Sequence, residues 1–219
     1  MLGNASTESD ESTALLTACG VLPVVRARSA SHLVEAVSAL ATSGVSAVEL
    51  TMTTPGALPA LETIRSRHAT GLLVGMGSIL SADDAARAVA AGAQFIVSPV
   101  RVDAVLERGR RLGVAVVPAA LTPTELHECH RAGAPLIKLF PASVVGAGYV
   151  REVLAPMPHL SLMPSGGVTL GSIPDWRSAG ARVVSLGGAL LGDALEGGDL
   201  RELEERARTA LRSWNESAQ

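Results

Sequence analysis

Eight short apolar runs recur along the chain, and their starts lie roughly 20–26 residues apart. They span residues 21–26, 47–51, 72–76, 94–98, 114–118, 136–140, 160–164 and 182–186. Each run is rich in Val, Ile and Leu and is bounded by Gly, Pro, Ser or Thr. Runs of this kind are typical of strands in a parallel sheet that is covered on both faces. The pattern therefore predicts eight buried parallel strands.

Segments with helical spacing separate these runs. Within residues 31–42, apolar side chains recur from Leu33 at i, i+1, i+4, i+7 and i+8, which places them on one helix face. Ser81 and Thr122 stand at N-cap positions before acidic first turns. Glycines such as Gly44 follow the helix ends, where a left-handed residue is favoured. Strand and helix therefore alternate as repeated β/α units.

Eight β/α units in about 200 residues predict an α/β fold, a single (β/α)₈ TIM barrel at the short end of its size range. The alternative is a doubly wound open sheet. A barrel is favoured by the number of units and because no Gly-x-Gly-x-x-Gly follows the first strand; Gly75-Met76-Gly77 is only Gly-x-Gly. We expect the barrel over residues 14–213, a flexible N-terminal tail over 1–13 and a C-terminal tail over 214–219.

Composition narrows the class of protein. The chain has 219 residues, of which 47% are hydrophobic, so it can build the core of one large domain. Its net charge of −3 argues against a nucleic-acid partner. No apolar run reaches the ~18 residues of a membrane span, and residues 1–13 lack the basic and apolar parts of a secretory signal, so we expect a cytoplasmic protein. Cys19 and Cys129 have neither the number nor the spacing for a disulfide framework or a zinc site.

Two charged residues interrupt the apolar runs. Lys138 lies in the middle of the sixth run, where a buried ammonium group is costly, and both faces of that run are apolar. Glu49 lies in the second run, on the small and polar face that suits the barrel interior. The pair is either a structural ion pair or a nucleophilic amine with a carboxylate beside it. Because a buried ion pair adds little stability, the chemical interpretation is favoured.

Two glycine pairs follow the seventh and eighth runs: Gly166-Gly167 and Gly187-Gly188. Free backbone N–H groups in such turns bind anions, and the loops after strands seven and eight are the frequent phosphate site of TIM barrels. Glycine pairs also simply permit tight turns. Two pairs on neighbouring strands favour a phosphate or another anionic group at this place.

Other candidate site residues close the first four predicted strands. In chain order they are Arg26, then Thr53 and Thr54, then Ser78, and then Ser98-Pro99. The carboxyl ends of barrel strands carry the active site, and an arginine there suits a carboxylate. The five histidines fall in or beside the predicted helices, and no carboxylate at a strand end completes a site with His127 and His130. We therefore expect no metal site.

Five segments, in this order and spacing, resemble those of one known family. They are Val48-Glu49-Leu50-Thr51, Gly75-Met76-Gly77-Ser78, Phe95-Ile96-Val97-Ser98-Pro99, Ile137-Lys138-Leu139-Phe140-Pro141-Ala142 and Pro164-Ser165-Gly166-Gly167-Val168. From about Val21 to Leu195, the chain is similar to the 2-keto-3-deoxy-6-phosphogluconate aldolase / 4-hydroxy-2-oxoglutarate aldolase family. The resemblance implies a class I aldolase in a homotrimeric TIM barrel, with no metal and no cofactor.

The resemblance also implies a role for each candidate. Lys138 matches the lysine that forms a Schiff base, Glu49 the catalytic glutamate, and Ser78 the hydroxyl that contacts the pyruvate carboxylate. Arg26 and Thr53 would help to hold that carboxylate, and Pro99 and Phe140 would wall the site. The phosphate loops match Gly166, Gly167, Gly187 and Gly188. The implied reaction joins or separates pyruvate and an aldehyde, either glyceraldehyde 3-phosphate or glyoxylate.

Two positions depart from the family's pattern. Thr53 stands where many members carry an arginine, while Arg26 matches an arginine that some relatives have after the first strand. Ala189 stands where many members have a serine beside the last glycine pair. Both changes leave imine chemistry intact, but they leave open which aldehyde is used and whether it carries a phosphate.

Two other classes of function stay open from the sequence alone. A phosphate-binding barrel isomerase or synthase would share the glycine turns but would not need Lys138. An inactive barrel that serves as an oligomeric scaffold would tolerate Thr53 and Ala189, although a buried lysine without a use costs stability.

Overall fold

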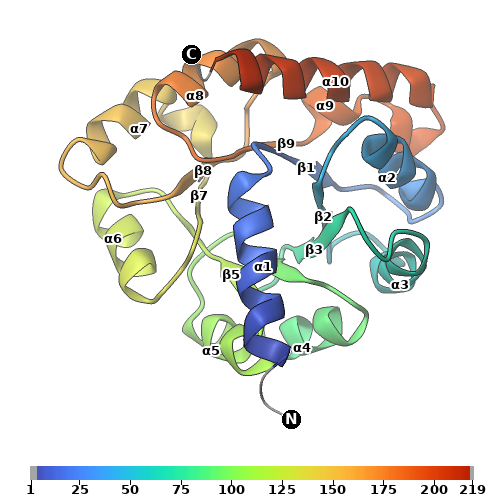
Figure 1. Cartoon of the computed structure of the whole chain (residues 1–219), viewed down its shortest axis with the longest axis horizontal. Helices are drawn as coiled ribbons and strands as arrows, with labels where there is room; N and C mark the ends of the chain where they lie inside the picture. The colour runs from blue at the N-terminus through green and yellow to red at the C-terminus, as the bar shows by residue number, and fades with distance from the viewer. Residues whose placement is uncertain (1–3, 218–219) are drawn as a thin grey trace.

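Parallel strands curl into a barrel in the computed structural model, which describes residues 4–217, with side chains from Glu11 onward (Figure 1). The strands are β1 (Val21–Val25), β2 (Ala47–Thr51), β3 (Leu73–Gly77), β4 (Phe95–Val97), β5 (Ala115–Val117), β6 (Ala119–Ala120), β7 (Ile137–Leu139), β8 (Leu162–Pro164) and β9 (Val184–Leu186). They pair in the orders β5-β4-β3-β2-β1-β9 and β6-β7-β8. A bridge between Ser165 and Ser185 joins the second sheet to the first. The prediction of a TIM barrel is confirmed.

All eight predicted strands are present, and a ninth short strand, β6, follows the fifth beyond its predicted end at residue 118. Val117 of β5 pairs with Val97 of β4, whereas Ala119 of β6 pairs with Lys138 of β7. Pro118 lies between β5 and β6, where the chain stops pairing with β4 and begins to pair with β7. Because proline has no N–H to donate to a ladder, it fits such an interruption.

Helices cover the outside of the barrel (Figure 1). They are α2 (Leu33–Thr42), α3 (Ala57–Arg67), α4 (Ala82–Ala90), α5 (Asp103–Leu112), α6 (Pro123–Arg131), α7 (Ala147–Leu154), α8 (Ile173–Ser178), α9 (Gly188–Leu191) and α10 (Leu200–Glu216). The predicted caps form, since Ser81 accepts a hydrogen bond from the Asp84 N–H, and Thr122 and Glu125 make a capping box. No described helix has both the length and the apolar character needed to cross a membrane.

Two apolar layers lie on opposite faces of the strands. Val48 and Leu50 of β2 belong to the outer layer, between strands and helices. Ala47 of the same strand belongs to the inner layer, which fills the barrel with Leu22, Leu73, Phe95, Val97, Ala115, Val117, Leu136, Met163 and Val183. The alternation along each strand decides which face a side chain joins, and it places alternate residues of β2 and β7 inside.

Helix α1 (Asn4–Ala18) crosses the end of the barrel where the strands begin (Figure 1). A flexible tail was expected over residues 1–13; residues 1–3 lie outside the described residues, whereas residues 4–13 belong to this helix. Leu16 explains why the segment docks. Its side chain is fully buried in the inner layer, with Leu73, Leu136 and Val183, which lie at or just before strand starts. The helix therefore closes one end of the barrel.

The C-terminal tail expected over residues 214–219 also differs from the structure. Helix α10 extends to Glu216, while residues 218–219 lie outside the described residues. Trp214 is buried and packs at Gly20, where a side chain would overlap the indole. The Arg177 guanidinium stacks over the Trp214 ring, 4.4 Å from its centroid. This packing keeps the last turns of the helix on the barrel.

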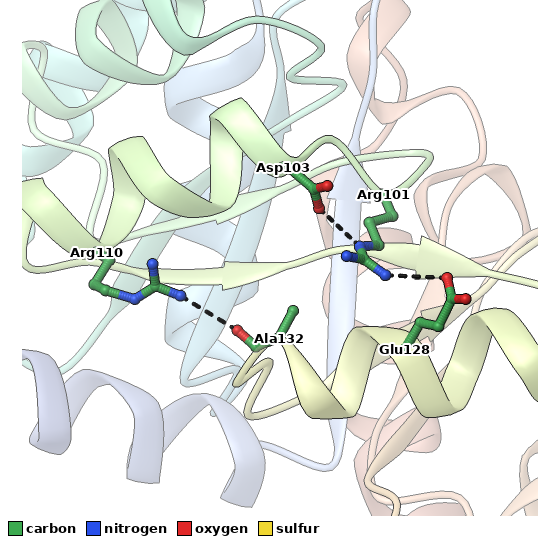
Figure 2. Close-up of polar contacts among 5 residues, drawn as sticks. All are labelled: Arg101, Asp103, Arg110, Glu128 and Ala132. Carbon is green, nitrogen blue, oxygen red and sulfur yellow. Dashed lines mark hydrogen bonds and ion pairs between the residues drawn. The ribbon is translucent and has the colours of Figure 1, made fainter.

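Polar contacts hold α5 beside α6. Figure 2 shows Arg101, which precedes α5, donating to Asp103 at 2.8 Å and to Glu128 of α6 at 3.1 Å. Arg110 of α5 donates to the Ala132 carbonyl, beyond the end of α6, at 3.4 Å. Each half-exposed pair adds little stability, and together they fix the position of one helix relative to the other.

Candidate active site

Lys138 and Glu49 share the interior of the barrel. In β7, Ile137 and Leu139 join the outer apolar layer, while Leu136 joins the inner one. Lys138 therefore points inward with Leu136, which the sequence pattern alone could not decide. Glu49 takes the inner face of β2, as predicted, and the Lys138 Nζ lies 3.8 Å from the Glu49 Oε1.

Both side chains are withdrawn from water. Glu49 is 1% exposed and Lys138 is 6% exposed, and no other charged residue is buried among those whose burial the structure describes. Neither carboxylate oxygen of Glu49 has a hydrogen-bond partner in the described chain. A buried polar group without a partner is expected where a ligand or water completes the bonding.

The electrostatic surroundings suit a group that accepts and returns a proton. Burial raises the pKa of the Glu49 carboxyl, because the charged form is poorly solvated in the barrel. The positive charges of Lys138 and Arg26 act in the opposite direction and lower that pKa. A carboxyl with a raised pKa next to an amine is typical of acid–base sites.

Two glycines in β3 leave space in the barrel interior for the side chains of Glu49 and Phe95. A Cβ at Gly77 would overlap the Glu49 carboxylate, and a Cβ at Gly75 would overlap the Phe95 ring. The Gly-x-Gly of this strand is therefore a steric feature of the interior. It lets Glu49 lie across the face of β3, toward the lumen.

A cleft of about 680 Å³ opens above Lys138 at the carboxyl ends of the strands. Its lining includes Arg26, Lys138, Phe140 and both predicted glycine turns, Gly166-Gly167 and Gly187-Gly188. The Lys138 Nζ lies 5.3 Å from the centroid of the Phe140 ring, which forms part of the wall. The structure thus brings the predicted lysine, the aromatic wall and the glycine turns to one opening.

Two serines that the sequence analysis did not single out also line this cleft. Ser165 of the turn after β8 and Ser185 of β9 are buried, and the Ser165 Oγ donates to the Ser185 Oγ at 3.3 Å. Their signal in the sequence is weak, since it is only a hydroxyl shortly before each glycine pair. Lys138 stands out more clearly in the sequence than these serines do, because it is the only lysine in the chain.

Arg26 and Ser78 meet at the edge of the site. The Arg26 Nη2 donates to the Ser78 Oγ at 3.3 Å, although the two residues follow different strands. Ser78 has a φ of 62°, which is rare for a residue other than glycine and is concentrated at functional sites. This contact joins two of the predicted carboxylate-binding residues.

Four predicted residues do not line the main cleft. Glu49 and Ser78 reach it through their contacts with Lys138 and Arg26, whereas Thr53 and Pro99 lie apart from it. Thr53 is exposed and its hydroxyl donates to the Thr51 Oγ1 at 3.3 Å. Pro99 lines a neighbouring hollow of about 520 Å³, which shares Phe140 with the cleft and is also lined by Arg101 and Glu128. In the part of the chain that the structure describes, no three His, Cys, Asp or Glu side chains come close enough to hold a metal ion.

Known proteins resemble this chain over nearly its whole length. Residues 13–205 match the family model described as "Aldolase: KDPG and KHG aldolase". The 2-dehydro-3-deoxy-phosphogluconate aldolase of Dickeya dadantii is 31% identical over 200 residues, which are 90% of this chain and 93% of the relative. A probable 2-dehydro-3-deoxy-6-phosphogalactonate aldolase of Rhizobium meliloti is 31% identical over 167 residues, which are 76% of this chain and 79% of the relative.

A solved structure agrees with these matches. The crystal structure of a 4-hydroxy-2-oxoglutarate / 2-dehydro-3-deoxyphosphogluconate aldolase superposes with a TM-score of 0.83, at 30% identity, over 93% of this chain and 98% of the other. The barrel, its buried lysine–glutamate pair and the extent of the match lead to one assignment. The chain belongs to the KDPG and KHG aldolase family, a family of lyases.

Proposed function

We propose that this protein is a pyruvate-dependent class I aldolase that works through an imine on Lys138. Its substrate would be a 2-keto acid of the 2-keto-3-deoxy-6-phosphogluconate or 4-hydroxy-2-oxoglutarate type, cleaved to pyruvate and either glyceraldehyde 3-phosphate or glyoxylate. The observation that carries the proposal is the buried Lys138 amine 3.8 Å from the Glu49 carboxylate. An amine in such a site, with a proton acceptor beside it, is equipped to attack a carbonyl carbon.

The imine forms in two steps. The Lys138 nitrogen bonds to the C2 carbonyl carbon of the substrate, and the carbonyl oxygen takes up a proton to give a carbinolamine. Protonation of that hydroxyl, with Glu49 as the nearest proton carrier, then releases water and leaves a protonated imine. The positively charged imine can accept an electron pair from the neighbouring carbon–carbon bond.

Cleavage needs a base at the C4 hydroxyl. Glu49, directly or through one water, takes the proton of that hydroxyl, and the C3–C4 bond breaks. The aldehyde leaves, and the electron pair stays on the pyruvate fragment as an enamine. Protonation at C3 and hydrolysis of the imine then free pyruvate and Lys138. Positioned acid–base groups of this kind contribute about 10²–10⁴ in rate.

The remaining predicted residues would bind the two ends of the substrate. Arg26 and Ser78 would hold the carboxylate, and Phe140 would wall the reacting carbons, while Thr53 and Pro99, which the sequence also predicted for these roles, lie outside the main cleft. The N–H groups of the turns at Gly166-Gly167 and Gly187-Gly188 would hold a distal phosphate. The proposed mechanism uses no metal and no cofactor, because the imine itself accepts the electrons.

Two further proposals rest on the resemblance to the family. We propose that the protein acts as a homotrimer in the cytoplasm. Sedimentation of the purified protein would test the first of these: a trimer mass supports it, and a monomer mass contradicts it.

One observation favours a second candidate function. The two glycine turns line one cleft beside Arg28, which is also what a phosphate-binding isomerase or synthase would need. Such an enzyme would not depend on Lys138. The two candidates are therefore separated by the requirement for the lysine.

Release of pyruvate from the two types of 2-keto acid tests the proposed function. We expect the wild-type protein to release pyruvate from at least one of them and the Lys138→Ala variant to release none above background. Retained activity in a folded Lys138→Ala variant would contradict the proposal. A substrate that must carry a phosphate would support the anion role of the glycine turns.

A further inference from the structure

A cluster of threonine hydroxyls lies at the carboxyl end of β2. Thr51 and Thr54 are 0% and 2% exposed, and their hydroxyl oxygens are 3.1 Å apart. The Thr53 hydroxyl donates to the same oxygen of Thr51 at 3.3 Å. Buried hydroxyls are stable only where they are hydrogen-bonded, and here they bond largely to one another.

One bond connects this cluster to a different strand. The backbone N–H of Ala27, directly after Arg26, donates to the Thr54 Oγ1 at 3.1 Å. Since an amide nitrogen only donates, the Thr54 hydroxyl accepts here and has its own proton free for Thr51. The turn after β1 is therefore fastened to the end of β2 through the Thr54 side chain.

The hydrogen bond from the Ala27 N–H to Thr54 restrains the backbone next to Arg26. Strand β2 lies between β1 and β3 in the sheet, and the Arg26 side chain reaches from the end of β1 to Ser78 after β3. The guanidinium thus spans the end of the strand that holds Glu49. Because Arg26 is itself exposed, two contacts orient it: the bond from its tip to Ser78 and the turn that carries its backbone.

We propose that Thr54 is a positioning residue for the substrate carboxylate, acting through the Ala27 N–H to fix the turn that presents Arg26. The inference rests on the proposed function, in which Arg26 binds that carboxylate. A long arginine side chain loses rotamer freedom when it binds, and a fixed backbone reduces that loss. Thr54 would therefore affect substrate binding more than it affects bond cleavage.

Two variants of Thr54 separate its hydroxyl from its shape. Thr54→Val keeps the shape and removes the acceptor, and we expect KM for the cleaved 2-keto acid to rise about tenfold with little change in kcat. Thr54→Ser keeps the acceptor and should restore KM to near the wild-type value. Ser43→Ala is the matched control, because Ser43 is also buried but bonds only to the Ala39 carbonyl within α2. It should lower stability without raising KM.

A double-mutant cycle with Arg26→Ala decides whether Thr54 acts through Arg26. We expect Thr54→Val to raise KM in the wild-type background and to add nothing in the Arg26→Ala background. An equal rise in both backgrounds would overturn the inference. An unchanged KM in Arg26→Ala would also overturn the inference, because Arg26 would then not bind the substrate carboxylate. If Arg26→Ala still forms an imine on Lys138, the proposed reaction is unaffected by that result.

Discussion

At the scale of single residues, the barrel interior combines two groups that are costly to bury. Attraction between Lys138 and Glu49 offsets only part of the free energy lost when both leave water. The carboxylate also has no hydrogen-bond partner in the described chain, and the space it fills exists only because residue 77 is glycine. A buried charge pair and an unpartnered carboxylate both oppose stability, and residues that oppose stability are typical of a functional site.

Gly77→Ala tests whether the position of the Glu49 carboxylate matters. The added methyl group would overlap the carboxylate, which must then move relative to Lys138. A misplacement of about 1 Å can cost about 100-fold in rate, so we expect kcat/KM to fall by about that factor. Gly148→Ala in α7 is the control, since a Cβ there meets nothing within 4 Å. Equal kcat/KM values for the two variants would contradict the role given to Glu49.

The pH profile tests the charge around Glu49. The proposed cleavage needs the ionised carboxylate, and burial raises the pKa of Glu49, so the acid limb of kcat/KM should lie above the ordinary range of a glutamate. The Arg26 charge lowers the pKa of Glu49, so removing it in Arg26→Ala should raise that pKa and move the limb to higher pH. Arg28→Ala is the control, because Arg28 lines the cleft but is not among the charges that lower the pKa of Glu49. A limb that stays in place in Arg26→Ala would contradict this prediction.

At the scale of elements, each strand contributes side chains to two apolar layers, one inside the barrel and one beneath the helices. A helix closes one end of the barrel. Apolar runs bounded by turn residues were sufficient to predict eight of the nine described strands, because a buried parallel strand is apolar on both faces. The two-residue strand β6 is too short to form such a run. Helix α1 was not predicted, because the first thirteen residues are mostly polar and a single buried leucine anchors its last turn. One buried residue does not produce the apolar periodicity from which a helix is predicted.

Leu16→Ala tests whether α1 closes the barrel. Leu16 is fully buried, whereas its neighbour Leu15 is 49% exposed. We expect Leu16→Ala to lower the free energy of unfolding by about 2–5 kcal/mol, and Leu15→Ala to change it by less than about 0.5 kcal/mol. Urea unfolding of the two variants gives both values. Similar losses would show that α1 does not pack as described.

At the scale of the whole molecule, the sequence predicted which strand ends build the site but not every contact between them. Lys138, Glu49 and the glycine turns could be found because each interrupts an apolar run or follows one. The bond from Ala27 to Thr54 joins residues 27 positions apart, and the Arg26–Ser78 bond joins residues 52 apart. Such contacts depend on the register between neighbouring strands, which the pattern of apolar and polar residues within each strand does not determine.

The central claim is that Lys138 forms an imine with a 2-keto acid, and borohydride reduction in the presence of pyruvate tests it most directly. Because Lys138 is the only lysine in the chain, intact-mass spectrometry and peptide mapping give an unambiguous answer. We expect one pyruvate adduct per chain, located on Lys138 and absent from Lys138→Arg. A folded protein that gains no adduct, or gains it only at the N-terminal amine, would contradict an imine on Lys138.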